Sequence, residues 1–139
     1  MHATTHVPVL LPQKFVHYVT DGGHAFAQSL VRMDQVVEFI GDDPDTQRQV
    51  FNLCLSLIIT SLPQLRRAMK NGDLASLRRI AHHTRGSLGL LGVPHLQALG
   101  EEIEYRCDEL GAERRRQRCQ QLCEMLEHLQ LELEARLAA

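Results

Sequence analysis

The sequence predicts an all-α protein, an antiparallel up-down four-helix bundle with an N-terminal helical extension. Apolar residues recur at spacings of three and four along most of the 139 residues, which is the period of amphipathic helices. No stretch shows the convincing alternation of apolar and polar residues that is typical of a strand. Glycine, proline and aspartate interrupt the helical pattern at short connections, and short connections make successive helices antiparallel neighbours.

The composition fits one soluble domain and argues against two classes of partner. Hydrophobic residues make up 44% of the chain and charged residues 23%, both ordinary for a globular protein. The net charge of -2 gives no attraction toward nucleic acid or an anionic membrane. The longest apolar run, residues 50–62, contains polar residues and is shorter than the about 20 residues that span a bilayer. We therefore expect a cytoplasmic protein with neither a nucleic-acid nor a membrane partner.

The cysteines are interpreted as small apolar residues in a reducing compartment. They form no Cys-x-x-Cys pair. Cys119 and Cys123 are one helical turn apart, a spacing that suits a metal, but His128 falls on nearly the opposite face from Cys119. We therefore expect no metal site. The four cysteines are Cys54, Cys107, Cys119 and Cys123.

The first 40 residues are predicted to hold a loose tail and one or two helices. Residues 1–12 contain two prolines and scattered small polar side chains. Residues 13–40 follow a helical pattern that Asp21-Gly22-Gly23 interrupts. We assign residues 1–32 to this tail and helical extension, and residues 33–139 to the bundle.

The second predicted helix follows a clear stop and restart. Gly41 closes the preceding helix in the left-handed conformation. Asp43 caps the next helix, with Pro44 at its first position, where the missing N–H costs nothing. This helix runs to about residue 69, and its apolar surface is wider than one stripe. Either the N-terminal extension or a partner protein is expected to cover the additional apolar residues. These are Leu53, Leu55, Ile59 and Leu62.

Three further helices complete the predicted bundle. Asp73 caps a third helix that runs to about residue 91, where Gly92-Val93-Pro94 breaks it. A fourth helix covers residues 94–111, and a fifth runs from residue 112 almost to the C-terminus. Both carry an apolar stripe for the core. The stripes are Leu96, Leu99 and Ile103, then Cys119, Leu122, Leu126, Leu129, Leu133 and Leu137. The fourth helix also has a face interpreted as solvated, made of Glu101, Glu102, Glu104, Arg106, Asp108 and Glu109.

The third helix carries an unusual histidine. His82 lies far from the apolar side of the helical wheel, so we expect it to face solvent. Gly86 and Gly89 share its side of the helix, although each glycine inside a helix costs about 0.5–1 kcal/mol relative to alanine. The same side carries three arginines, Arg78, Arg79 and Arg85. A histidine stripped of bulky neighbours is accessible to another large molecule.

Such a site suits phosphoryl transfer. A neutral imidazole is a good nucleophile near pH 7. Arg85, one turn from His82, has the charge and donors to bind phosphate oxygens. Gly86 and Gly89 would allow a partner to approach the helix closely, and the arginines Arg78 and Arg79 extend the binding face. No carboxylate pair or third group indicates a hydrolase triad.

These residues resemble the signature of the histidine-containing phosphotransfer (HPt) domains of multistep two-component phosphorelays. The family pattern Ala-His-x-Leu-Lys-Gly-Ser appears here as Ala81-His82-His83-Thr84-Arg85-Gly86-Ser87, with Gly92 ten residues after the histidine. The resemblance covers roughly residues 33–135. Its flanks are Gly41-Asp42-Asp43-Pro44, Gly72-Asp73, Leu96, Leu99 and Ile103-Glu104.

The resemblance implies specific roles for residues and partners. His82 would be the phosphoacceptor, Arg85 would stand at the phosphate-interacting lysine position, and Gly86 would admit the receiver domain. The implied partners are response-regulator receiver domains and a hybrid sensor kinase. The Mg²⁺ of the transfer would belong to the receiver, so this chain would need no cofactor. Arginine for lysine changes reach and geometry. Thr84 in place of leucine suggests either looser packing or a hydroxyl bonded back to the preceding turn.

Two alternatives are weighed against this hypothesis. Kinase dimerisation domains also present a histidine on a bundle, but the acidic residue and proline that follow theirs are absent after His82, and no ATP-binding motif is present. We therefore expect a phosphocarrier without autokinase activity. The second alternative is a regulatory four-helix module that binds partners through its apolar helix surface without phosphotransfer. The start at Met1 favours a standalone protein over a domain of a larger hybrid kinase.

Overall fold

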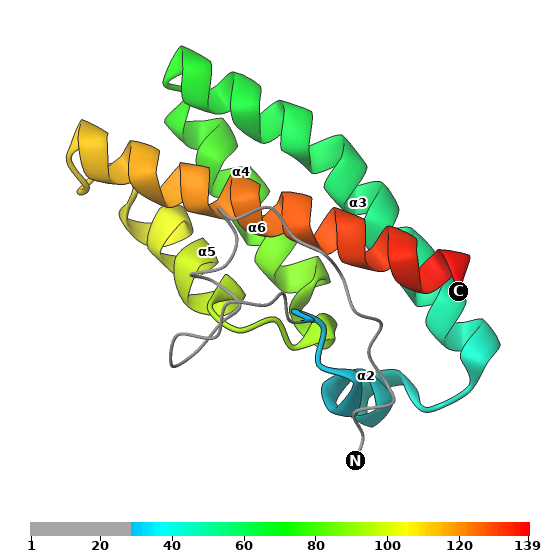
Figure 1. Cartoon of the computed structure of the whole chain (residues 1–139). Helices are drawn as coiled ribbons and strands as arrows, with labels where there is room; N and C mark the ends of the chain where they lie inside the picture. The colour runs from blue at the N-terminus through cyan, green and yellow to red at the C-terminus, as the bar shows by residue number, and fades with distance from the viewer. Residues whose placement is uncertain (1–28) are drawn as a thin grey trace.

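The computed structural model of the chain describes residues 29–139, and this part consists of helices and their connections, without strands (Figure 1). The all-α prediction is therefore confirmed. The predicted tail and the interruption at residues 21–23 lie outside the described residues. The elements are α2 (Met33–Ile40), α3 (Pro44–Asn71), α4 (Leu74–Ser87), the 3₁₀ helix η3 (Gly89–Leu91), α5 (Leu96–Arg106) and α6 (Ala112–Ala138).

The two predicted aspartate caps are confirmed. The Asp43 carboxylate accepts a hydrogen bond from the Thr46 backbone N–H at 2.9 Å, and Pro44 stands at the start of α3. The Asp73 carboxylate accepts from the Ser76 N–H at 3.1 Å at the start of α4. Each cap satisfies a backbone donor that the first helical turn leaves without an intrahelical partner. These two caps set where the histidine-bearing helix and its predecessor begin.

Several predicted helix boundaries are wrong. The third helix ends at Ser87 rather than near residue 91, because the chain then tightens into η3 with bonds between residues three apart. Gly89 therefore lies outside the helix. α5 begins at Leu96 rather than Pro94, and it ends at Arg106 rather than near residue 111. Gly41 has the predicted positive φ of 87°, but its ψ of -173° is extended and not left-handed helical.

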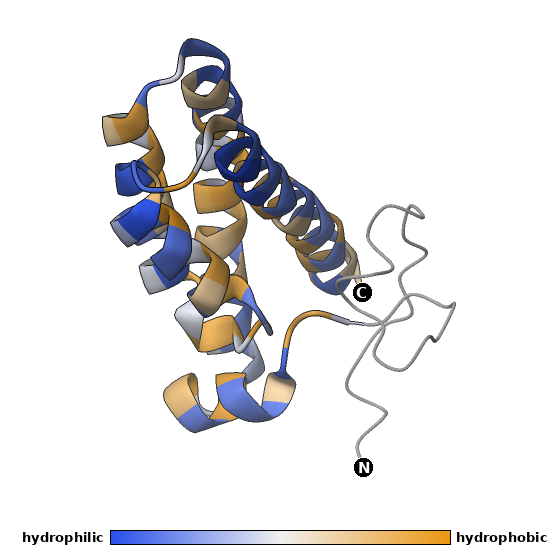
Figure 2. Cartoon of the chain, turned by 90° about the vertical axis from the view of Figure 1, so that its left-hand side faces the viewer, coloured by the Kyte–Doolittle hydropathy of each residue, from blue (hydrophilic) through white to orange (hydrophobic). Residues whose placement is uncertain are grey.

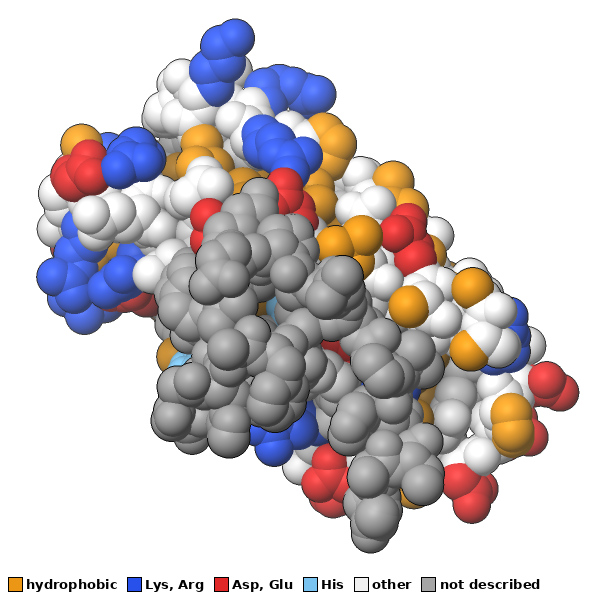
Figure 3. Space-filling model, in the orientation of Figure 1, with side chains coloured by type: hydrophobic (Ala, Val, Ile, Leu, Met, Phe, Trp, Pro, Cys, Tyr) orange, Lys and Arg blue, Asp and Glu red, His pale blue; other side chains and the backbone are white. Residues whose placement is uncertain are grey.

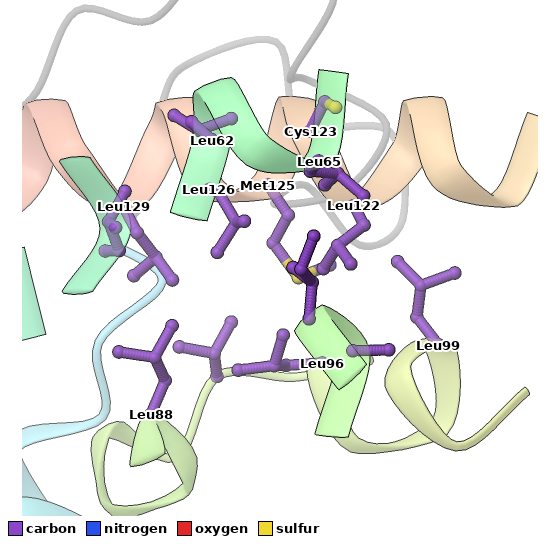
Figure 4. Close-up of a cluster of buried hydrophobic side chains, with 14 of the residues drawn as sticks. Leu62, Leu65, Leu88, Leu96, Leu99, Leu122, Cys123, Met125, Leu126 and Leu129 are labelled. Atoms are coloured by element: carbon purple, nitrogen blue, oxygen red, sulfur yellow. The ribbon is translucent and has the colours of Figure 1, made fainter. Parts of the chain in front are cut away.

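The long helices surround one hydrophobic core. α3 packs beside α4 and α6, and α5 packs beside α4 and α6 (Figure 1). Figure 2 shows hydrophobic residues on the inner sides of the helices and hydrophilic residues on their outer sides. The predicted stripes of α5 and α6 are buried except for Leu137, which is half-buried. Side chains from several helices point into the cluster drawn in Figure 4, among them Leu62, Leu65, Leu96, Leu99, Leu122, Met125, Leu126 and Leu129.

The wide apolar face of α3 is only partly covered. Leu62 is buried and Leu55 is half-buried. In contrast, the side chains of Leu53 and Ile59 are 71% and 50% exposed. Figure 3 shows hydrophobic side chains along the edge of the molecule where α3 runs. Among the described residues, no helix is long and apolar enough to cross a bilayer.

A buried carboxylate on α6 joins the start of the described chain to the bundle. Glu132 is almost fully buried, and it accepts hydrogen bonds from the backbone N–H groups of Leu30 at 2.6 Å and Val31 at 3.3 Å. The guanidinium of Arg136 donates to the same carboxylate at 3.1 Å. Ser29 also donates its hydroxyl to Glu132. Leu30 and Val31 are themselves buried, so this segment is part of the core that α2 then closes at one end.

The four cysteines are buried and free, and we predict that they are unreactive in the folded protein. Burial raises the pKa of the Cys54 and Cys119 thiols to about 11 and that of Cys123 to about 12. At pH 8 roughly one thousandth or less of such a thiol is the reactive thiolate. We expect labelling by Ellman's reagent to be at least about 100-fold slower in buffer than in denaturant. Equal rates would show that the thiols are accessible.

Candidate functional site

His82 stands on the outer side of α4, as the helical wheel predicts. The opposite side of α4 is buried through Leu77, Ile80, Ala81 and Thr84. The His82 side chain is 65% exposed. The Thr84 hydroxyl donates to the carbonyl of Ile80 at 2.9 Å, so the bond to the preceding turn, one of the two alternatives expected for Thr84, is present. Core packing on one side of α4 thus directs the imidazole to the surface.

Glu104 on α5 fixes one side of the imidazole. Its Oε2 lies 2.8 Å from Nδ1 of His82, and the Glu104 side chain is only 14% exposed. A carboxylate accepts hydrogen bonds, so the Nδ1 of a neutral His82 ring carries the proton. The unprotonated Nε2, with its lone pair, is then on the opposite side of the ring. The arrangement therefore presents a nucleophilic nitrogen away from α5.

The second oxygen of Glu104 is held by Arg85. The Nε of Arg85 donates to Oε1 of Glu104 at 2.8 Å, and its Nη2 donates to the Tyr105 hydroxyl at 3.0 Å. The guanidinium also lies 5.5 Å from the centre of the Tyr105 ring. Partial burial raises the pKa of Glu104, but the hydrogen bonds from Arg85 and His82 outweigh it, and the net pKa lies below its usual value. The carboxylate is therefore ionised throughout the neutral pH range, where it accepts both bonds.

The remaining predicted site residues have different surroundings. Gly86 is exposed, and a Cβ added there would meet nothing within 4 Å. At Gly89 an added Cβ would lie 3.2 Å from Nε2 of Gln97, so this glycine faces α5 and not open space. Arg78 pairs with Asp108 at 3.3 Å, and Arg79 donates to the Ser76 hydroxyl at 3.5 Å. The structure thus joins His82 and Arg85 through Glu104, with Arg78 and Arg79 one turn earlier.

Three residues of α5 belong to this network although the sequence does not predict them as site residues. Glu104 is expected on a solvated face, and this expectation is wrong, because the carboxylate is largely buried between α4 and α5. Gln97 donates to the backbone carbonyl of Arg85 at 2.7 Å, and Tyr105 holds the guanidinium. The spacing of Gln97, Gly100 and Glu104 at three and four positions would have placed them on one side of α5. The spacing does not show that α4 packs against this side of α5, because that contact depends on the tertiary structure.

The ring of His82 is exposed at the surface of α4. A hollow of about 300 Å³ lies near the end of α4, and His82 is not among its lining residues. Across residues 29–139, no three His, Cys, Asp or Glu side chains are grouped so that they would hold a metal ion. The exposed ring of His82 is thus accessible from solvent.

The comparisons with known proteins identify one family. The family model described as Hpt domain matches residues 49–139, about two thirds of the chain, including His82, Arg85 and Glu104. Neither the curated proteins nor the solved structures gave a match. A match over this share of the sequence, on a helical bundle with an exposed histidine, shows that the chain belongs to the Hpt domain family.

Proposed function

We propose that His82 accepts a phosphoryl group from the aspartyl phosphate of one receiver domain and passes it to the aspartate of another, in a multistep phosphorelay. Hpt domains carry out histidine phosphotransfer in two-component phosphorelays. The observation that carries the assignment to His82 is its geometry. The ring is exposed, and Oε2 of Glu104 lies 2.8 Å from Nδ1, where it accepts a hydrogen bond from a ring protonated at Nδ1 and leaves Nε2 as the nucleophile.

The proposed transfer balances without a cofactor of this chain. The Nε2 lone pair of His82 attacks the phosphorus of the aspartyl phosphate. A bond forms between Nε2 and phosphorus, while the bond from phosphorus to the carboxylate oxygen breaks and its electron pair leaves with the aspartate. The ring keeps its Nδ1 proton and gains positive charge, which the Glu104 carboxylate stabilises. The reverse sequence delivers the phosphoryl group to the next receiver, and each receiver supplies its own Mg²⁺.

The partners follow from this chemistry. We propose that the donor is the receiver domain of a hybrid sensor kinase and that the acceptor is a response regulator, both in the cytoplasm. Residues 33–139 would form the phosphotransfer domain. The chain would act as a phosphocarrier without autokinase activity, so incubation with labelled ATP alone would leave it unlabelled.

A transfer assay tests the proposed function. The protein is mixed with a receiver domain that carries labelled phosphate, and the label on this chain is tested for stability. Phosphohistidine is labile in acid and stable in alkali, whereas aspartyl phosphate is labile in alkali. We expect acid-labile, alkali-stable label to accumulate on this chain. A protein that binds phosphorylated receivers but takes up no label from any of them would instead favour a regulatory binding module.

Gly86 provides a test of the proposed receiver-binding face. Because an added Cβ meets no atom within 4 Å, Gly86→Gln should fold normally and place bulk beside His82. We expect phosphoryl uptake from a receiver to fall about tenfold or more, which corresponds to about 1.4 kcal/mol of lost binding. Uptake from phosphoramidate, a small donor that needs no docking, should be unchanged.

Ala98→Gln, at an exposed position of α5, is the matched control. It adds the same side chain outside the proposed face, and its uptake from both donors should equal that of the wild type. An unchanged rate of receiver-dependent uptake in Gly86→Gln would remove Gly86 from the docking surface.

A further inference from the structure

Arg85 stands at the position where the family resemblance places a phosphate-contacting cation, yet its contacts are with α5. Its Nε donates to Glu104 and its Nη2 donates to Tyr105, at 2.8 and 3.0 Å. The Arg85 side chain is only 18% exposed, in contrast to the largely exposed His82 ring. Two of the three guanidinium nitrogens are therefore engaged by side chains of α5.

Gly100 makes this placement of Arg85 sterically allowed. A Cβ at residue 100 would lie 2.9 Å from the Cβ and 3.0 Å from the Cδ of Arg85. Both distances are well inside ordinary van der Waals contact, so any larger residue would displace the arginine stem. The side-chain amide of Gln97 donates a hydrogen bond to the backbone carbonyl of Arg85 at 2.7 Å. One side of α5 thus receives the stem and the guanidinium of Arg85.

The Glu104 carboxylate connects this arrangement to the imidazole. Each of its oxygens has one partner, Arg85 at Oε1 and His82 at Oε2, both at 2.8 Å. The contact with Arg85 fixes the rotation of the carboxylate, because a charge-assisted bond from a guanidinium is directional. The orientation of Oε2 toward Nδ1 of His82 therefore depends on Arg85.

We propose that Arg85 is a positioning residue, which holds Glu104 so that this carboxylate keeps the proton of His82 on Nδ1, and that it is not a phosphate ligand. This proposal rests on the proposed function, in which Nε2 of His82 is the nucleophile. Nε2 has a free lone pair only if the proton of the neutral ring is on Nδ1. A hydrogen bond at one ring nitrogen selects the tautomer and leaves the other nitrogen unprotonated. Arg85 acts through Glu104 and does not contact the reacting atoms.

The test measures the tautomer of His82 directly in the unphosphorylated protein. The ¹⁵N chemical shifts of the imidazole distinguish a ring protonated at Nδ1 from one protonated at Nε2, and at pH 8.5 an ordinary histidine is neutral. We expect the Nδ1–H form in the wild type. In Arg85→Gln the shifts should move toward the mixture of an exposed histidine, and phosphoryl uptake from a receiver should fall about tenfold.

Gly100→Ala should produce the same change while the charge of Arg85 is retained. Alanine favours a helix more than glycine does, so this variant tests the displaced arginine stem and not the stability of α5. Arg79→Gln is the control, because it removes an exposed arginine from the same side of α4 without touching Glu104. Its tautomer should match the wild type.

Two results would overturn the proposal. If Arg85→Gln lowers the uptake rate but keeps the wild-type tautomer, Arg85 acts on the phosphate or the receiver. If Arg85→Gln changes neither quantity, Arg85 has no role in the site. The tautomer measurement needs no phosphodonor, so absence of label on the wild-type protein would contradict the proposed function separately from the role of Arg85.

Discussion

Replacing His82 by glutamine is expected to abolish phosphoryl uptake, whereas His83→Gln should retain it. His82 is the ring whose Nδ1 is held by Glu104 at 2.8 Å, while the neighbouring His83 ring is 6.4 Å away, centre to centre, and edge-on to it at 76°. Of these two rings, His82 is the one with a carboxylate partner within residues 29–139. Glutamine has no nitrogen that forms a phosphoramidate of this kind. The measurement is acid-labile, alkali-stable label transferred from a phosphorylated receiver, with loss of at least about 1,000-fold, as removal of a nucleophile gives.

The paired variants separate chemistry from folding. Both histidines are exposed, so each substitution should change the free energy of unfolding by less than about 0.5 kcal/mol. Circular dichroism and thermal unfolding of the two variants should therefore match the wild type. Label that persists in His82→Gln and disappears in His83→Gln would move the phosphoacceptor to His83. Label that persists in both would contradict phosphorylation on this helix.

The fold class follows from local features of the sequence. The starts of α3 and α4 depend on Asp43 and Asp73, whose side chains bond to backbone N–H groups three residues on. Such caps are encoded within four residues, so they are predictable without the rest of the protein. The buried stripe of α6 is likewise a matter of helical period, and its residues from Cys119 to Leu133 lie in the core.

The helix boundaries that differ from the predicted ones depend on contacts between residues far apart in the sequence, which form when the helices pack. The sequence around Gly89 permits a longer helix, but the chain tightens into η3 where the Leu91 carbonyl accepts the backbone N–H of Arg32 at 2.8 Å. That contact joins residues far apart in the sequence. The helical period alone therefore could not place the end of α4 at Ser87.

Part of the candidate site follows from local sequence features, and part depends on packing between helices. The exposure of His82 follows from its place on the wheel of α4, and the proximity of Arg85 follows from their separation by one turn. Glu104 is different, because a glutamate beside other acidic residues on α5 gives no sign that it is buried against a neighbouring helix. Its role depends on Gly100, which brings the two helices close enough for Arg85 to cross α5. The phosphoacceptor assignment stays a prediction, and the network gives it a physical basis.

Glu132→Gln is expected to lower the free energy of unfolding by about 3–5 kcal/mol, the cost of breaking a buried charge pair by removing one partner. The carboxylate accepts backbone bonds from Leu30 and Val31 and pairs with Arg136, whose side chain is itself buried. Glutamine is nearly isosteric, but its amide group presents N–H donors where the carboxylate accepts. The variant therefore removes the negative charge that faces Arg136 and one of the two acceptor oxygens at this site, and urea unfolding measures the loss.

Glu134→Gln is the matched control, since Glu134 is exposed on the same helix and should change stability by less than about 0.5 kcal/mol. Hydrogen exchange gives a second readout, because the amides of Leu30 and Val31 donate directly to Glu132 and should lose protection in Glu132→Gln. His82 and Glu104 lie on other helices, so the variant should keep the phosphoryl uptake of the wild type wherever it is folded. Equal stability of the two variants would show that the Glu132 carboxylate does not hold residues 29–31 on the bundle.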